Sequence, residues 1–146
     1  MKMSSFIIIA TVFVWVGCLA AISFMESWLK FQAPGITVPL GLGIGRLVFG
    51  ALNKMEWAFT LIIAASLFFG AVKHPPSALL WYAVPVFILL LQTFWMLPAL
   101  DLRAQAVLNG QTGPPSLLHW YYAGGEVIKI ISLFLLGFGI FKLYWQ

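Results

Sequence analysis

The residues of this chain whose types and spacing could do chemistry are concentrated in one stretch, Leu117–Ile131. The stretch places a histidine, two tyrosines, a glutamate and a lysine in an otherwise apolar run. At 100° per residue, His119, Tyr122, Glu126 and Lys129 fall within about 80° of one another on a helix. Ionisable groups at membrane depth are costly, so by default they face a protein interior or a hydrated cavity and mark function. The spacing therefore predicts a polar helix face, without naming its ligand or reaction.

The composition places this face in a membrane protein. Of the 146 residues, 62% are hydrophobic and 8% are charged, whereas a soluble domain carries roughly 25% charged residues. The length allows a single membrane domain, residues 1–146, and no separate soluble domain. The net charge of +4 comes from dispersed lysines and arginines. Because no basic run exists, we expect the lipid bilayer as the surrounding partner and no nucleic acid.

The cysteine and histidine counts limit the cofactors. Cys18 is the only cysteine, which excludes an intrachain disulfide and a thiolate cluster for a metal. His74 and His119 are the only histidines, and the topology below places them on opposite membrane faces. We therefore expect no metal site, no haem held by two histidines and no other resident cofactor.

The apolar runs predict the fold class, an all-α integral membrane protein with four transmembrane helices in one bundle. A helix of about 20 apolar residues spans a hydrocarbon core of about 30 Å. Asn53 and Glu56 have the spacing of a helix start, with a cap and an acidic residue three positions later. The predicted helices cover about residues 6–29, 53–72, 78–100 and 117–144.

The glycine- and proline-rich stretch 33–52 lies between the first two predicted helices. It is apolar enough to contact lipid, yet Arg46 lies in its middle. Two interpretations stay open: a half-inserted or interfacial segment packed against protein, or the lead-in to a long second helix. In either case Arg46 needs a partner, for which Glu26 and Glu126 are the candidates.

Four spans place both termini on one side of the membrane, so the polar residues converge near the other side. Within the third helix, Gln92 is the lone strongly polar residue and is typical of a helix–helix contact. Glu26 and Lys30 are spaced four apart in the favourable order for an ion pair. Basic residues near the two faces are too evenly divided to fix the orientation. The candidate ligand- or ion-binding residues are Glu26, Lys30, Arg46, Gln92, Asp101, Arg103, His119, Tyr122, Glu126 and Lys129.

Several short motifs resemble the transmembrane protein 205-like family and its bacterial relatives, which form a domain family of unknown function. The motifs are Phe49-Gly50 before the second helix, a W-x-L-P from Trp95 to Pro98 with Arg103 after it, and Leu118-His119 opening the last helix. The chain departs from the family by its glycine-rich link and by a shorter loop before the last helix. The resemblance implies a four-helix protein of a bacterial inner (cytoplasmic) membrane, in a family of which some members are linked to drug or metal export.

Three functional hypotheses remain open. In the first, the bundle binds or transports a small molecule or ion, with Glu126 as a proton- or cation-responsive carboxylate. In the second, the protein is a membrane enzyme acting on a lipidic substrate with His119 and Glu126 as acid and base. In the third, Glu126–Lys129 and Glu26–Lys30 are architectural ion pairs that fix helix packing or a homo-oligomer, and the protein is a partner subunit.

Overall fold

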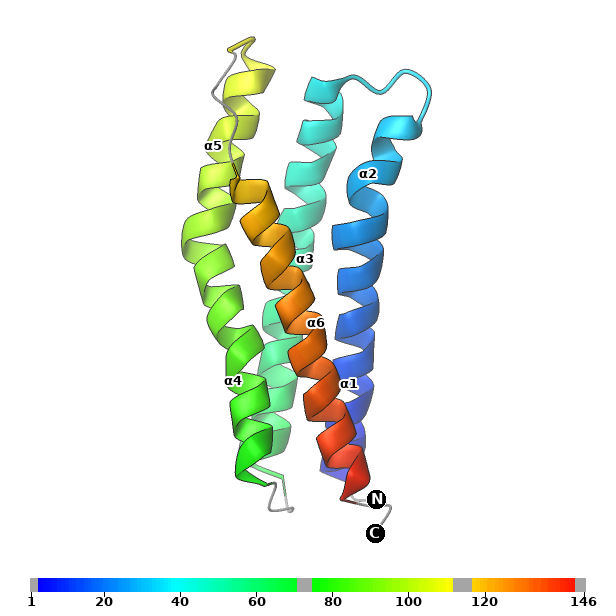
Figure 1. Ribbon diagram of the computed structural model, residues 1–146, viewed down its shortest axis with the longest axis vertical. Coiled ribbons are helices and arrows are strands. Elements are labelled where there is room, and N and C mark those ends of the chain that lie inside the picture. The colour runs from blue at the N-terminus through cyan, green and yellow to red at the C-terminus, as the bar shows by residue number, and fades with distance from the viewer. Residues whose placement is uncertain (1–2, 71–74, 112–116, 144–146) are drawn as a thin grey trace.

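The computed structural model describes residues 3–70, 75–111 and 117–143, and every regular element within these ranges is helical. In this part of the chain, four helical stretches are long and apolar enough to cross a membrane. They form the all-α bundle that the sequence predicts (Figure 1). The four spans are Met3–Gln32, Val38–Phe68, Pro76–Leu108 and Leu118–Lys142.

Two of the spans are continuous α-helices, and the other two each contain a π-helical segment. The continuous ones are α3 (Val38–Phe68) and α6 (Leu118–Lys142). The first span consists of α1 (Met3–Leu19), the π-helical segment Ala20–Glu26, α2 (Ser27–Leu29) and the 3₁₀ turn Lys30–Gln32. The third span consists of α4 (Pro76–Leu91), the π-helical segment Gln92–Met96 and α5 (Leu97–Leu108).

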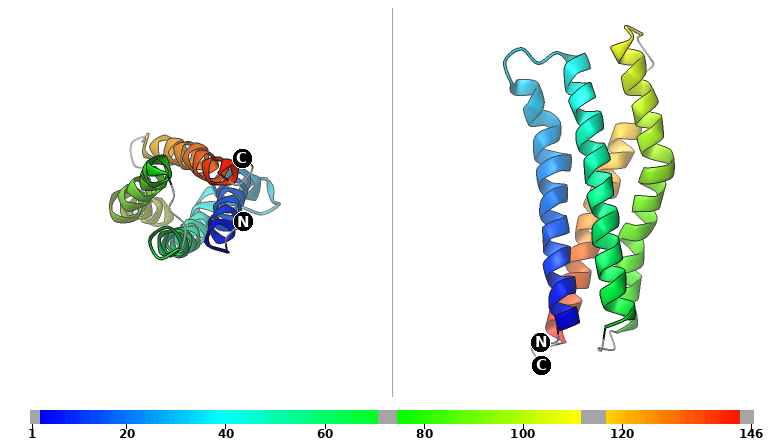
Figure 2. Two further views of the ribbon diagram at one scale, coloured as in Figure 1. Left: turned by 90° about the horizontal axis from the view of Figure 1, so that it is seen from below. Right: turned by 180° about the vertical axis from the view of Figure 1, so that it is seen from behind.

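The helices pack as an antiparallel bundle in which α6 contacts α1 and α4, while α3 contacts α1 and α5. Figure 2 shows the four spans arranged around a common axis, with both termini at one end, as predicted. We call the half of the bundle that contains the termini the apolar half. Its core is formed by buried aliphatic side chains from three spans, Ile8, Val12, Ile63, Leu133, Leu136 and Ile140. The opposite half, which contains Lys30, Arg46, Asp101 and His119, is called the polar half.

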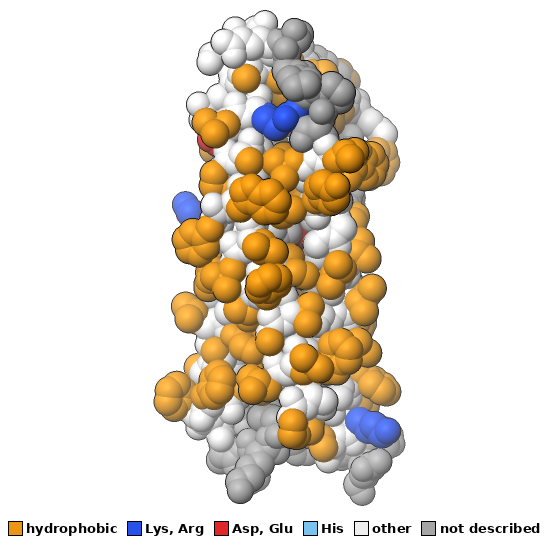
Figure 3. Space-filling model, turned by 60° about the vertical axis from the view of Figure 1, so that its left-hand side comes forward, with side chains coloured by type: hydrophobic (Ala, Val, Ile, Leu, Met, Phe, Trp, Pro, Cys, Tyr) orange, Lys and Arg blue, Asp and Glu red, His pale blue; other side chains and the backbone are white. Residues whose placement is uncertain are grey.

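The outer surface of the bundle is apolar. Large side chains such as Phe69, Phe87 and Phe138 are exposed, and Figure 3 shows hydrophobic side chains over most of the face in view. Soluble monomers rarely expose contiguous apolar patches of this extent. The surface therefore suits the hydrocarbon region of a bilayer, and the protein is an integral multi-pass membrane protein.

The start of the second span differs from the prediction, because α3 begins at Val38 and not at Asn53. Thr37 caps the helix by accepting a hydrogen bond from the Leu40 amide at 3.4 Å, and Pro39 occupies the first turn. Asn53 is a buried residue inside the helix and caps nothing. Residues 38–52 form the first part of the long helix α3. Of the two interpretations of residues 33–52, the lead-in to a long second helix is therefore the one confirmed.

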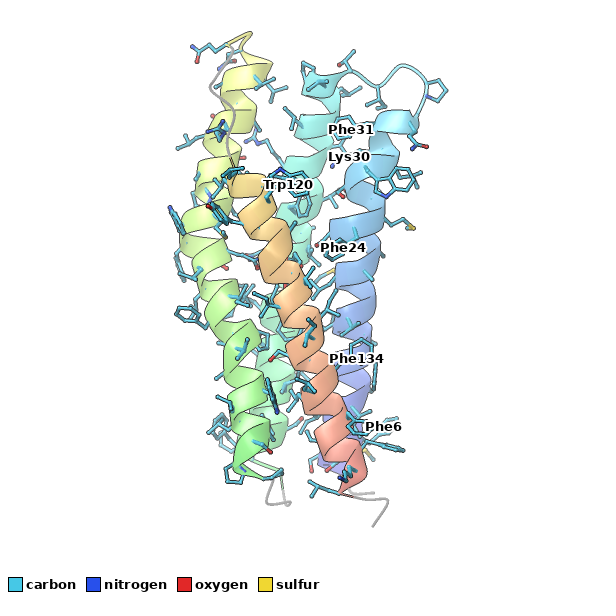
Figure 4. The ribbon with its side chains drawn as sticks, in the orientation of Figure 1. Phe6, Phe24, Lys30, Phe31, Trp120 and Phe134 are labelled. Carbon is cyan, nitrogen blue, oxygen red and sulfur yellow. The ribbon has the colours of Figure 1, made fainter. Side chains whose placement is uncertain are left out.

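Two glycines allow this lead-in to lie close to the first span. A Cβ atom at Gly41 would lie 2.2 Å from the Phe31 ring, and one at Gly45 would lie 2.9 Å from Lys30 Nζ. Phe31 and Lys30 point from the end of the first span toward α3 (Figure 4). Glycine costs about 1 kcal/mol in a helix relative to alanine. Here it gives space to two neighbouring side chains, a contact that the glycine pattern alone does not reveal.

The spans also differ in length, and the difference appears at the polar end. At 1.5 Å per residue the first three, of 30, 31 and 33 residues, are about 45–50 Å long, whereas α6 with 25 residues is about 38 Å long. The third span ends at Leu108 and not near residue 100 as predicted. In Figure 1, α6 begins below the ends of the other spans. His74 and the predicted end of the last helix at residue 144 lie outside the described residues.

Candidate functional site

The polar face of α6 is directed into the bundle, as its spacing predicts. Tyr122 is 2% exposed, and Glu126 and Lys129 are completely buried. His119 is the exception, because it lies in the first turn of α6 and is exposed. The helix thus brings a carboxylate and an ammonium into the protein interior and leaves the imidazole outside it.

The Lys129 ammonium is the centre of a buried network. It donates to Gln92 Oε1 at 2.6 Å and to Glu56 Oε1, and it lies 2.9 Å from Glu126 Oε1. A lysine ammonium has three donors, and these three acceptors, one each from α3, the third span and α6, match that number. A buried charge is tolerated when it is paired and hydrogen-bonded in this way.

Both oxygens of the Glu126 carboxylate accept hydrogen bonds. Gln92 Nε2 donates to Oε1 at 2.7 Å, and Ser23 Oγ donates to Oε2 at 3.1 Å. Together with Lys129, these contacts join α6 to the first and third spans. The predicted Glu126–Lys129 pair is therefore present, and Gln92 connects helices as predicted.

Both donors to Glu126 other than Lys129 come from π-helical segments. Ser23 lies within Ala20–Glu26, and Gln92 is the first residue of Gln92–Met96. A π-helical turn inserts an extra residue into the helical register and is frequent at functional sites. These two segments aim polar side chains at the same carboxylate from two different spans, both of which pack on α6.

Three members of the network are absent from the sequence-predicted site: Glu56, Trp15 and Ser23. Glu56 is completely buried, and its Oε1 also accepts a hydrogen bond from Trp15 Nε1 at 3.0 Å. The sequence predicts Glu56 in the first turn of a helix capped by Asn53, and this prediction is wrong because α3 starts at Val38. The repeat Leu52, Glu56, Thr60, all buried on one face, is the signal that could have identified it. Ser23 and Trp15 carry no comparable signal.

Beyond the network, toward the polar end, the four spans line a partly open cavity of about 660 Å³. Its wall is mostly apolar and includes the rings of Phe31 and Phe49 as well as Leu97 and Pro98. Four side chains that can carry charge interrupt this apolar wall, namely Lys30, Arg46, Asp101 and His119. Of the predicted residues, Gln92, Glu126 and Lys129 do not line the cavity but lie in the network, and Arg103 is in neither set.

The charges around the cavity are paired. Lys30 Nζ lies 3.3 Å from Glu26 Oε2, as predicted, and also lies over the Phe31 and Phe49 rings at 5.5 and 5.6 Å from their centroids. Arg46 pairs with Asp101 through Nε, so both partners predicted for it are wrong. The unpredicted extension of the third span to Leu108 carries Asp101 on a helix that packs against α3.

Tyr122 connects the cavity with the network. Its ring lines the cavity and contacts Phe49 edge-on, with 5.4 Å between centroids. Its hydroxyl is buried, and the structure gives it no hydrogen-bond partner among the described residues. Tyr122 also lies one turn before Glu126 on the same face of α6. A buried hydroxyl without a partner is costly and calls for a ligand, a water or a proton-transfer role.

The candidate site offers no cluster for a metal within the described ranges, because no three histidine, cysteine or acidic side chains there come together in a suitable group. His119 and Glu126 do not meet either, since one is exposed at the cavity and the other is enclosed in the network. Comparison with protein-family models, with curated proteins and with solved structures gave no match for the chain. The resemblance to the transmembrane protein 205-like family stays a prediction.

Proposed function

We propose that this multi-pass membrane protein binds a small molecule in the cavity of its polar half, as a transporter-like protein. The supporting observation is the cavity itself, about 660 Å³ in volume and lined by residues of all four spans. Small-molecule sites typically measure about 300–1,000 Å³ and combine apolar walls with a few polar groups. Five residues that carry the predicted family resemblance, Phe49, Gly50, Leu97, Pro98 and His119, line it.

The lining favours an amphiphile with an anionic head. Asp101 contacts Arg46 through Nε only, which leaves the terminal guanidinium nitrogens for a carboxylate or phosphate. Lys30, which is paired with Glu26, lies in the same wall and can donate a further hydrogen bond to the ligand. The Phe31 and Phe49 rings offer an apolar surface for the rest of the ligand. We infer that the head of the ligand lies beside Arg46 and Lys30 and that its apolar part extends along the rings.

The lengths of the spans support a cavity at the membrane interface. If the hydrocarbon core of about 30 Å begins at the terminal end of the bundle, it covers about 20 residues of each span. Trp28, Trp95 and Trp120 are exposed on three different spans near the cavity, and tryptophan is enriched at membrane interfaces. A ligand would then enter the cavity from the interface without crossing the bilayer first.

A cysteine-accessibility experiment tests the proposal. Gly50 lines the cavity, and a Cβ there meets nothing within 4 Å, whereas its neighbour Ala51 is exposed on the outer surface. In a Cys18→Ala background, N-ethylmaleimide should modify Gly50→Cys quickly and Ala51→Cys slowly, since a thiol in lipid does not ionise. Octanoate should protect Gly50→Cys severalfold, and octanol should protect it less.

Two results would contradict the proposal. Equal labelling of both cysteines would contradict the proposal that the cavity contains water. Fast labelling of Gly50→Cys with no protection by octanoate would contradict the proposal that the cavity binds an anionic amphiphile.

The architectural hypothesis is favoured by one observation, the complete burial of Glu56, Glu126 and Lys129 in a closed network. We propose that the network supports the bundle, while the ligand binds in the cavity. The enzyme hypothesis has weaker support, because its acid and base, His119 and Glu126, lie in different parts of the site.

A further inference from the structure

The buried network contains more acidic than basic groups. Glu56 and Glu126 contribute two carboxylates and Lys129 contributes one ammonium, and all three are completely buried. The other side chains in contact with them, Trp15, Ser23 and Gln92, are neutral donors or acceptors. With all three ionisable groups charged, the network would therefore carry a net charge of −1 in the protein interior.

The ion pairs Lys30–Glu26 and Arg46–Asp101 are each neutral and do not balance this excess. Glu26 of the first span forms an ion pair with Lys30, with 3.3 Å between Oε2 and Nζ, and this pair adds no net charge. On α3, Lys54 is exposed. Helix α4 has no charged residue. The hydroxyl of its Tyr82 donates a hydrogen bond to the Thr60 carbonyl. On α6 the only other neighbour that titrates is Tyr122, which is also acidic. An uncompensated charge in such surroundings is expensive, and the group neutralises in preference.

The hydrogen bonds distinguish the two carboxyl groups. Glu126 accepts hydrogen bonds at both oxygens, which is the pattern of an ionised carboxylate. Glu56 accepts from Trp15 and Lys129 at Oε1 only, while its Oε2 is buried with no partner in the described residues. The unpartnered oxygen is the one that gains most from carrying a proton, because protonation removes its charge.

We propose that Glu56 is a proton-binding site, neutral at rest, and that its proton exchanges with the cavity through Tyr122. Release leaves the Glu56 carboxylate beside the Lys129 ammonium and delivers the proton to water in the cavity. Tyr122 lines the cavity and lies one turn before Glu126 on α6. Its hydroxyl and Glu56 Oε2 are both buried without a hydrogen-bond partner in the described residues, so the two are not bonded to each other directly, and a water between them would complete the relay. The inference deepens the proposed function, on which it rests only for the coupling of this proton to a ligand.

Infrared spectroscopy of the purified protein in lipid nanodiscs tests the proton count. At neutral pH the wild type should show the C=O band of one protonated carboxylic acid, which shifts in D₂O. Glu56→Gln and Glu126→Gln should each lose the band, because the remaining carboxylate and Lys129 then balance. Lys129→Gln should show about twice the wild-type band, since both carboxyl groups must then be neutral. Glu26→Gln is the matched control and should retain it.

Tyr122→Phe tests the route in a variant that removes a hydroxyl with no partner. It should keep the band and slow its deuterium shift severalfold relative to the wild type. A wild-type spectrum without a protonated-acid band would overturn the proton site, whatever the behaviour of the variants. An unchanged exchange rate in Tyr122→Phe would overturn the relay. Because these spectra need no ligand, they are independent of octanoate protection at Gly50→Cys, and either proposal can fail alone.

Discussion

The two halves of the bundle are stabilised in different ways. In the apolar half, aliphatic residues such as Ile8, Val12, Leu136 and Ile140 fill most of the interior, and the buried polar side chains there, such as Ser5 and Ser132, carry no charge. In the polar half, the interior contains a charged network and, beyond it, a cavity of about 660 Å³. Hydrophobic side chains tolerate many arrangements of similar volume, whereas the network requires each donor to meet its acceptor. Substitutions in the apolar half should therefore be tolerated better than substitutions in the network.

The largest effect on the free energy of unfolding should follow from removing the Lys129 ammonium of the buried network. Lys129→Met leaves Glu56 and Glu126 buried without their shared donor. Breaking a buried pair from one side costs about 3–5 kcal/mol, so the free energy of unfolding should fall by about that amount. Unfolding in a mixed-micelle titration with sodium dodecyl sulfate measures it. Lys142→Met, at an exposed lysine in the last turn of α6, is the control. A loss below about 1 kcal/mol at Lys129 would mean that the network is not required for folding.

A smaller loss in the free energy of unfolding should follow from a substitution in the core of the apolar half. Leu136 is 1% exposed in its core, and Leu→Ala substitutions at such sites cost about 2–5 kcal/mol. We expect Leu136→Ala to fall near the lower end of this range, because lipid and neighbouring side chains can partly fill the space. The exposed neighbour Leu135 gives the control, Leu135→Ala, with little change in the same titration. Maleimide labelling of Gly50→Cys should stay unchanged in Leu136→Ala. Altered labelling would show that the two halves are not separable.

The helices and the inward face of α6 could be predicted from the sequence, but the partners in the polar half could not. Spacing at 100° per residue is sufficient for Tyr122, Glu126 and Lys129, because α6 is a regular helix. The same reasoning fails for Ser23, since the π-helical segment around it changes the register of the first span. Such segments depend on contacts between helices that a single periodic pattern does not contain.

The glycine-rich stretch 33–52 also depends on contacts between helices that the sequence pattern does not contain. Its glycines and prolines predict an interrupted segment, whereas in the structure Thr37 and Pro39 start a helix there, and Gly41 and Gly45 leave space for Phe31 and Lys30 of the first span. The partner of Arg46 was missed for a related reason. Asp101 lies beyond the predicted end of its helix, so the distance between the two residues could not be judged from the chain.

The close contact at Gly41 yields the third prediction. Gly41→Ala places a Cβ 2.2 Å from the Phe31 ring, which must move. Because this ring is 41% exposed and lines the cavity, we expect a cost at the lower end of the about 1–3 kcal/mol of overpacking. Gly43→Ala meets nothing within 4 Å and should stabilise the helix by up to about 1 kcal/mol. The two alanines therefore have opposite effects on the free energy of unfolding, although they lie two residues apart. Equal effects would show that the first span does not pack on α3 through this glycine.

The smallest effect on stability, with a clear effect on ligand binding, should come from Asp101→Asn. The Arg46–Asp101 pair is partly exposed, and such pairs contribute about 0–1 kcal/mol, so unfolding should hardly change. The substitution removes the anion that competes for the Arg46 guanidinium, and octanoate should therefore protect Gly50→Cys at lower concentration. Arg46→Gln is the matched change on the other side of the pair and should weaken protection with an equally small effect on stability. If Asp101→Asn weakened protection as strongly as Arg46→Gln does, the intact pair, and not the free guanidinium, would be what the ligand recognises.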